Sequence, residues 1–135
     1  MDVGEQNTAS LSGLRVLIVE DEPILAMCLS EAIEGEGCVV VGTAHTVVEA
    51  LALVATALFD VALLDRNLHG QPVGSIAAAI VDRGCAVVFS TGSRASAVPA
   101  MFQGWPVLRK PYKDEDVFAA LVAVRAVQPQ PSCSL

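Results

Sequence analysis

Five short runs of apolar, mostly β-branched residues recur along the chain, each bounded by polar or turn-forming residues. Runs of this length with few polar interruptions are typical of strands that are buried on both faces, as in a parallel sheet. They predict five strands, at residues 15–19, 38–42, 61–64, 86–89 and 107–109.

The segments between these runs have the 3.6-residue apolar period of amphipathic helices. Thr46 and Glu49 have the spacing of a capping box, Pro72 suits a first helical turn, and three acidic residues at 114–116 suit a helix N-terminus. Pro99 interrupts the fourth segment, which we expect to be short or irregular. The apolar stripes predict five helices, around residues 25–33, 47–58, 73–81, 94–102 and 117–124.

Strands that alternate with helices indicate an α/β fold, a doubly wound, flavodoxin-like parallel sheet with five strands, five helices and right-handed crossovers. A chain of 135 residues is the size of one domain. We expect this domain at residues 13–128, preceded by a flexible lead at residues 1–12 and followed by a flexible tail at residues 129–135.

Composition narrows the classes of function. Apolar residues make up 53 % of the chain and the net charge is −7, which argues against binding to nucleic acid or to an anionic membrane. The cysteines have no metal-ligand spacing and fit free thiols in a reducing compartment. No secretory pattern and no run long enough to span a bilayer is present, so the sequence predicts a cytoplasmic protein.

Polar side chains with potential chemistry stand at the carboxyl ends of four predicted strands. Glu20 and Asp21 follow the first strand, Asp65 the third, Thr91 the fourth and Lys110 the fifth. In a doubly wound sheet the ligand site lies at this edge. We therefore expect three carboxylates, a hydroxyl and an ammonium group to converge there.

Three carboxylates repel one another unless a cation joins them, and oxygen ligands of high charge suit Mg²⁺, which often shares its shell with a phosphate. Asp65 would be the nucleophile that attacks a phosphoryl donor, while Lys110 and the Thr91 hydroxyl bind the phosphoryl oxygens. Gly92 leaves the approach to the site open. The sequence thus predicts a magnesium-dependent phosphoacceptor site.

The motifs "VEDE", "LLDRN", "STG" and "RKP", in this order at the predicted strand ends, resemble those of the receiver domains of two-component response regulators. The resemblance covers about residues 14–127. It implies that Asp65 is the phosphoacceptor, that Thr91 is the switch hydroxyl and that Lys110 pairs with the phosphoryl group. It also implies a cis Lys110–Pro111 peptide bond. The segments around "FSTGS" and "RKPY" look most similar to single-domain receivers with a Phe-Ala-Thr-Gly motif.

The resemblance also implies how Mg²⁺ is bound. Asp21 and Asp65 would be direct ligands, together with the main-chain carbonyl of Asn67, and Glu20 would act through water.

Two positions depart from the family pattern. Arg94 replaces the tyrosine that closes the Phe-Ala-Thr-Gly motif, and Val107 replaces the aromatic residue three positions before the lysine that reports phosphorylation in many receivers. Switching by the usual aromatic rotamer is therefore not expected. We expect rearrangement of residues 92–104 to carry the signal instead.

The resemblance implies phosphorelay signalling through protein–protein contacts, with no attached output domain and no catalysis beyond the domain's own phosphorylation and dephosphorylation. The implied partners are a sensor histidine kinase or histidine phosphotransfer protein and an unknown downstream protein. The sequence also leaves open that the domain forms a homodimer.

The alternative function is that of a pseudo-receiver that never accepts phosphate. Asn67, where a phosphohydrolase needs an Asp as general acid, disfavours a hydrolase, and the absence of a Gly-rich first turn disfavours a nucleotide binder.

Two residues in the loop after Asp65 have more than one interpretation. Arg66 either guides phosphoryl donors or partners, or is a plain surface residue. His69 is favoured as a loop residue over a phosphohistidine.

Overall fold

A five-stranded parallel sheet lies at the centre of the molecule, in a computed structural model that describes residues 11–92 and 104–127, with side chains described as far as residue 125. All four strand pairs are parallel. In spatial order the strands are β2 (Val39–Ala44), β1 (Arg15–Val19), β3 (Val61–Asp65), β6 (Ala86–Thr91) and β7 (Val107–Arg109). The predicted five-stranded parallel sheet is confirmed. Strands β3 and β6 extend to Asp65 and Thr91, so both residues belong to the sheet itself.

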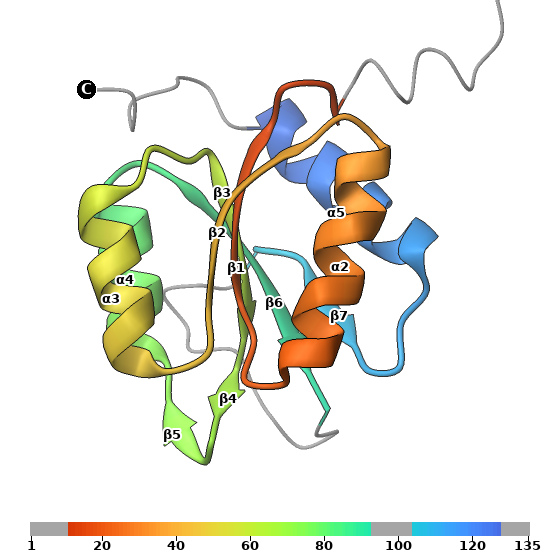
Figure 1. The fold of residues 1–135 in the computed structure, drawn as a ribbon. Helices are drawn as coiled ribbons and strands as arrows, with labels where there is room; N and C mark the ends of the chain where they lie inside the picture. The colour runs from red at the N-terminus through yellow and green to blue at the C-terminus, as the bar shows by residue number, and fades with distance from the viewer. Residues whose placement is uncertain (1–10, 93–103, 128–135) are drawn as a thin grey trace, which may run out of the picture.

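Helices cover both faces of this sheet (Figure 1). On one face lie α3 (Val47–Thr56) and α4 (Gly74–Asp82), and on the other lie α2 (Pro23–Gly35) and α5 (Asp114–Val127). Four helices thus belong to the part of the chain that the structure describes. The helix expected around residues 94–102 lies outside it, as do Arg94 and most of the segment expected to carry the switch.

The capping box predicted at the start of α3 is present, except that its second hydrogen bond comes from the residue before Thr46. The Thr46 Oγ1 atom accepts a hydrogen bond from the Glu49 N–H at 3.1 Å. The Glu49 carboxylate reaches back to the N–H of His45, at 2.8 Å, rather than to that of Thr46. Two N–H groups at the start of this helix are satisfied in this way.

The predicted start of α4 is wrong. The helix begins at Gly74, and Pro72 instead belongs to a short strand, β5 (Gln71–Pro72), that pairs antiparallel with β4 (Asn67–Leu68). The resulting hairpin projects beyond the carboxyl ends of the main strands (Figure 1). Leu68 is buried and fixes the hairpin to the core.

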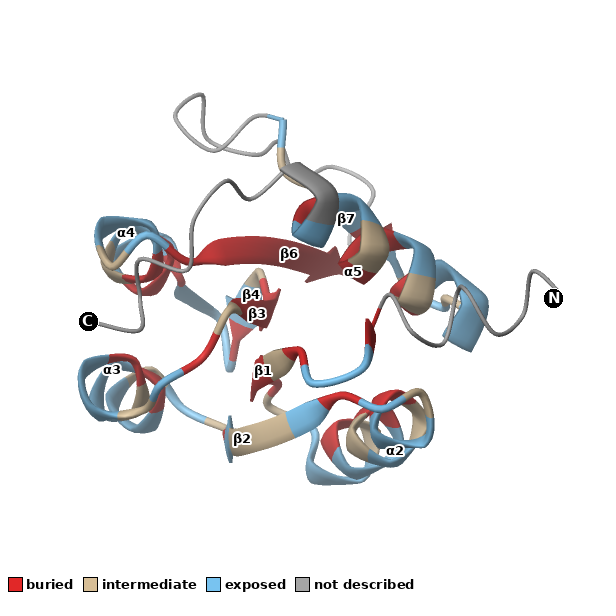
Figure 2. Cartoon of the chain, turned by 90° about the horizontal axis from the view of Figure 1, so that it is seen from above, coloured by how far each residue is buried: buried red, intermediate tan, exposed pale blue. Residues whose placement is uncertain are grey.

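Alternate side chains of each central strand enter two separate cores, and the central strands are largely buried (Figure 2). Strands β3 and β6 are buried throughout, and β1 is buried after Arg15. Leu17 and Val19 pack beneath α3 and α4, whereas Val16 and Ile18 pack beneath α2 and α5. Each fully buried side chain of this size stabilises the fold by about 1.5–3 kcal/mol. Two apolar cores therefore fix the strand register, and with it the positions of the residues at the strand ends.

The packed part of the chain begins before the predicted domain boundary. Leu11 belongs to the segment for which the sequence predicts a flexible lead, but it is buried in the core beneath α2 and α5. None of the described helices is long and apolar enough to cross a membrane.

Candidate functional site

An acidic pair stands directly after β1. The Glu20 N–H donates to the carbonyl of Ala44 at 2.9 Å, which continues the pairing between β1 and β2. Glu20 is only 1 % exposed, and its carboxylate also accepts a hydrogen bond from the N–H of Glu22 at 3.3 Å. The Nδ1–H of His45 donates to the Glu20 carbonyl at 2.8 Å. The turn that carries the acidic pair is thus held by the ends of two strands.

Lys110 joins two of the carboxylates. Its Nζ atom lies 3.1 Å from Oδ2 of Asp65 and 3.2 Å from Oε1 of Glu20. The Lys110 N–H donates to the carbonyl of Thr91 at 2.8 Å, and the Lys110–Pro111 peptide bond is cis, as the family resemblance implied. The ammonium group of the last strand therefore bridges carboxylates that follow the first and third strands.

The loop after Asp65 curls back over the acidic pair. The Asn67 N–H donates to Oδ1 of Asp65 at 3.1 Å, and the His69 N–H donates to Oδ2 of Asp21 at 3.0 Å. His69 has a φ angle of 52°, in the left-handed region, so the chain turns sharply at the residue whose N–H meets Asp21. The two loops that carry Asp21 and Asp65 are thereby connected by their own hydrogen bonds.

A cavity of about 440 Å³ opens over these groups. Its lining includes Asp21, Asp65 and Lys110, and also Thr91 and Gly92 at the end of β6. Arg66 and Asn67 complete the lining on the side of the β3 loop. Thr91 has little exposed surface, but it is one of the residues that line the cavity. It therefore borders the same space as Asp21 and Asp65.

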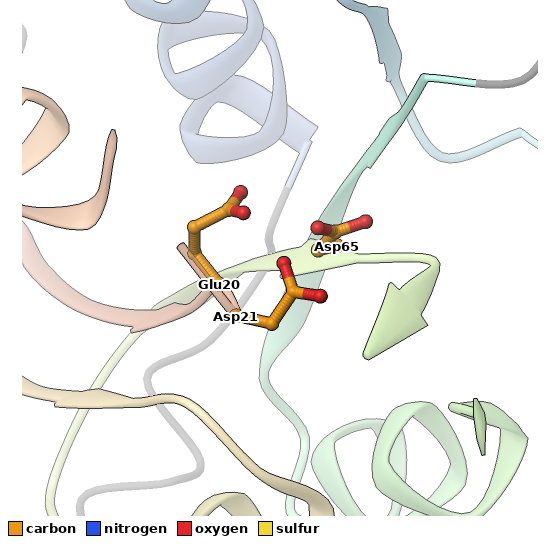
Figure 3. Close-up of side chains that lie close together, drawn as sticks. All are labelled: Glu20, Asp21 and Asp65. Carbon is orange, nitrogen blue, oxygen red and sulfur yellow. The ribbon is translucent and has the colours of Figure 1, made fainter. Parts of the chain in front are cut away.

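Figure 3 shows the carboxyl groups of Glu20, Asp21 and Asp65 gathered at the ends of β1 and β3. Each offers an oxygen atom that lies within 4.8 Å of the others. Burial, and then the Asp65 charge, raise the pKa of Glu20 to about 7, although Lys110 acts in the opposite direction. Glu20 therefore gives up its proton less readily than an exposed glutamate, and added positive charge at the site would favour its ionised form.

The surroundings of Lys110 and Asp21 favour their ionised forms. Burial would lower the pKa of Lys110, but its hydrogen bond to Asp65 and the charges of Asp65 and Glu20 outweigh burial and raise it. Burial would raise the pKa of Asp21, but the hydrogen bond from His69 and smaller contributions outweigh it and lower the pKa. Among the described residues, Lys110 is thus the cation that pairs directly with this group, and its single charge is smaller than that of the three carboxylates.

This donor set fits Mg²⁺. The three carboxylates supply only oxygen atoms, and these lie within 4.8 Å of one another. A divalent cation would neutralise the charge that Lys110 leaves over. Asp21, Asp65 and Glu20 would hold the ion. The structure places Asn67 beside Asp65, and the role of its main-chain carbonyl stays a prediction.

The structure therefore brings together all the side chains that the sequence singled out at the strand ends: Glu20, Asp21, Asp65, Thr91 and Lys110. Sequence reasoning did not find His45, although its place after the second strand puts it at the same edge. It also did not predict that the His69 main chain binds Asp21, because nothing in the sequence specifies a left-handed histidine.

Comparison with known proteins agrees with this geometry. The sequence profile of the response regulator receiver domain matches residues 16–122. The solution structure of SdrG from Sphingomonas melonis Fr1 is 39 % identical, with a TM-score of 0.74 over 87 % of this chain and 98 % of SdrG. A CheY-like receiver domain protein from Methanospirillum hungatei JF-1 is 26 % identical, with a TM-score of 0.75 over 87 % of this chain and 97 % of that one.

The response regulator PhyR from Brucella abortus is also similar, at 26 % identity and a TM-score of 0.73. The match covers 87 % of this chain but only 50 % of PhyR, so this chain corresponds to one part of that protein. A comparison with curated protein sequences found no match. The chain belongs to the family of response regulator receiver domains.

Proposed function

We propose that this receiver domain accepts a phosphoryl group on Asp65 in a magnesium-dependent reaction and signals through the change that follows. The main support is the contact between the Lys110 Nζ atom and Oδ2 of Asp65, at 3.1 Å, beside two further carboxylates and under an open cavity. A carboxylate that is oriented by a cation and faces open space is placed to act as a nucleophile.

Hydrogen bonds set the orientation of the nucleophile. Asp65 Oδ1 accepts from the Asn67 N–H and Oδ2 pairs with Lys110, so the carboxylate plane is fixed before a donor arrives. In the transfer, an Asp65 oxygen forms a bond to phosphorus while the bond from phosphorus to the donor breaks, and the electron pair leaves with the donor. Lys110 and the Thr91 hydroxyl then bind phosphoryl oxygens.

Asp21, Asp65 and the Asn67 carbonyl are the proposed direct ligands of Mg²⁺, and Glu20 would act through water. The ion would supply charge neutralisation for the phosphoryl oxygens when bound. Without this compensation the incoming phosphoryl group would meet three carboxylates and one ammonium group. The domain assists only its own phosphorylation and dephosphorylation, so we do not class it as an enzyme that acts on an external substrate.

The proposed donor is a sensor histidine kinase or a histidine phosphotransfer protein, whose phosphohistidine P–N bond would break in the transfer. An unknown downstream protein would receive the signal, and a homodimer is a further possible assembly. Three of the cysteines, Cys28, Cys38 and Cys85, are free thiols, which supports a reducing compartment and our proposal of a cytoplasmic location.

One experiment separates this function from that of a pseudo-receiver. The protein is incubated with acetyl phosphate and Mg²⁺, and its intact mass is measured under mild conditions. We expect a gain of one phosphoryl group in the wild type and none in Asp65→Asn, which keeps the size of the side chain. Chelation of Mg²⁺ should also abolish the gain. A wild-type protein that gains no mass with Mg²⁺ present would favour the pseudo-receiver.

A further inference from the structure

Arg66 is the second positively charged residue at the cavity, and the mechanism above does not use it. Its N–H donates to the carbonyl of Ser90 at 2.8 Å, so the pairing of β3 and β6 continues one residue beyond Asp65. This bond fixes the Arg66 backbone between the phosphoacceptor and Thr91. The side chain lines the same cavity as Asp65, Thr91 and Lys110.

The guanidinium group of Arg66 is incompletely satisfied. Its Nη1 atom is buried, and it has no hydrogen-bond partner among the residues that the structure describes. A guanidinium group stays charged in proteins, and a buried donor without an acceptor carries a desolvation penalty. Since Arg66 lines the cavity, an anion there that comes within hydrogen-bond distance of Nη1 would remove this penalty, because phosphoryl oxygens are strong acceptors for arginine.

The charge balance of the site points in the same direction. Glu20, Asp21 and Asp65 contribute three negative charges, which Lys110 and a divalent cation together neutralise. Phosphorylation replaces the single charge of Asp65 with about two. One negative charge is then left over, and Arg66 carries one positive charge at the wall of the same cavity.

We propose that Arg66 binds the phosphoryl group on Asp65 and stabilises the phosphorylated state. Lys110 is already shared between Glu20 and Asp65, so it is not available to the phosphoryl oxygens alone. Arg66 makes no contact of that kind through its Nη1 atom and supplies an unused donor. This inference rests on the proposed function, since it assigns a binding residue to the product of that reaction.

The test uses beryllofluoride, a mimic of the phosphoryl group, so that binding is measured apart from phosphoryl transfer. Binding of beryllofluoride with Mg²⁺, and of Mg²⁺ alone, is measured by titration for the wild type and for Arg66→Gln and Arg66→Lys. Arg109→Gln is the matched control, because Arg109 is exposed, lies at the end of β7 and carries the same charge without lining the cavity.

We expect Arg66→Gln to weaken beryllofluoride binding about tenfold, the typical scale of a lost charge-assisted hydrogen bond. Binding of Mg²⁺ alone should become equal or tighter, since a positive charge near the metal has been removed. Arg66→Lys should retain part of the beryllofluoride affinity, and Arg109→Gln should retain all of it. The lifetime of phosphorylated Asp65 should shorten in the same order.

The two measurements separate the possible failures. A folding defect in Arg66→Gln would weaken Mg²⁺ and beryllofluoride together, and Arg66→Met, which removes the buried charge and keeps an apolar stem, then serves as the second variant. Equal beryllofluoride affinity in wild type and in a folded Arg66 variant overturns the role of Arg66 and leaves the proposed function intact. A wild type that neither binds beryllofluoride nor gains a phosphoryl group contradicts the proposed function itself.

Discussion

The two edges of the central sheet handle charge in opposite ways. At the amino-terminal edge, the Asp60 carboxylate accepts hydrogen bonds from the Arg15 N–H at 2.9 Å and from the Arg15 guanidinium at 2.9 and 3.2 Å. One cation there meets one anion. At the carboxyl-terminal edge, Lys110 meets two carboxylates, and Asp21 adds a third.

The difference shows how a structural ion pair is told from a ligand site. The Arg15–Asp60 pair is complete within the chain, so it fixes β1 against the residue that precedes β3 and needs nothing further. The acidic group at the other edge is complete only with added positive charge. An excess of charge of one sign, held in place by two rigid cores, indicates function more strongly than any single residue there.

The largest change in stability should come from the edge that is already neutral. Asp60→Ala leaves the partly buried Arg15 N–H and guanidinium without their acceptor, and should lower the free energy of unfolding by about 1–2 kcal/mol. Urea denaturation of metal-free protein measures this. Its Mg²⁺ affinity should equal that of the wild type; a large loss of affinity would mean that the two edges are coupled.

Added Mg²⁺ should stabilise the other edge. A ligand that binds only the folded state raises its stability by an amount that grows with concentration, so the melting temperature should increase at millimolar Mg²⁺. Asp21→Ala should remove this increase, whereas Glu31→Gln, which also removes one negative charge from an exposed position, should retain it. A wild type that shows no shift would contradict the assignment of the metal site.

The pH dependence of the two edges should have opposite signs. Burial raises the pKa of Glu20 to about 7, so the metal-free protein should lose stability as the pH rises from about 4.5 to 7. Hydrogen bonds from Arg15 outweigh the burial of Asp60 and lower its pKa, so that contribution is present above about pH 3.8 and is lost as the pH falls further. Denaturation of Glu20→Gln and Asp60→Asn over a series of pH values, in the presence of a chelator, tests both contributions. Glu20→Gln should reduce the pH dependence of stability only between about pH 4.5 and 7, and Asp60→Asn should reduce it only below about pH 3.8.

The smallest effect should be a small loss. In the absence of metal, Asp21→Ala relieves repulsion from Glu20 and Asp65 but loses the hydrogen bond from the His69 N–H. The lowered pKa of Asp21 indicates that the favourable contacts outweigh the repulsion. We expect a net destabilisation of at most about 1 kcal/mol, because Asp21 is near the surface and solvent screens its charge. The urea midpoint of metal-free protein checks this, and a clear gain of stability would show that the repulsion dominates.

Much of the fold and the site followed from the sequence, because both depend on signals that lie within a few residues. Apolar runs such as Val61–Asp65 are buried on both faces, and their ends must meet at one edge of a parallel sheet. Asp65 and Lys110 could be brought together by topology alone, although 45 residues separate them.

The parts that were missed depend on contacts between distant segments or on special backbone conformations. Pro72 has the sequence signal of a helix start, but pairing with Asn67 draws it into a strand. Leu11 is a single apolar residue in a polar segment, and only the tertiary core shows where it packs. The Arg15–Asp60 ion pair connects the start of β1 with the residue before β3, and no local sequence pattern predicts this contact.

The left-handed turn at His69 has a spectroscopic consequence. Its amide proton points at an Asp21 oxygen that is also a proposed metal ligand. When a cation withdraws electron density from that oxygen, the hydrogen bond weakens, and the nitrogen–proton resonance of His69 should move upfield in proportion to occupancy. In isotope-labelled protein, this one backbone signal would then follow metal binding without any substitution in the acidic site.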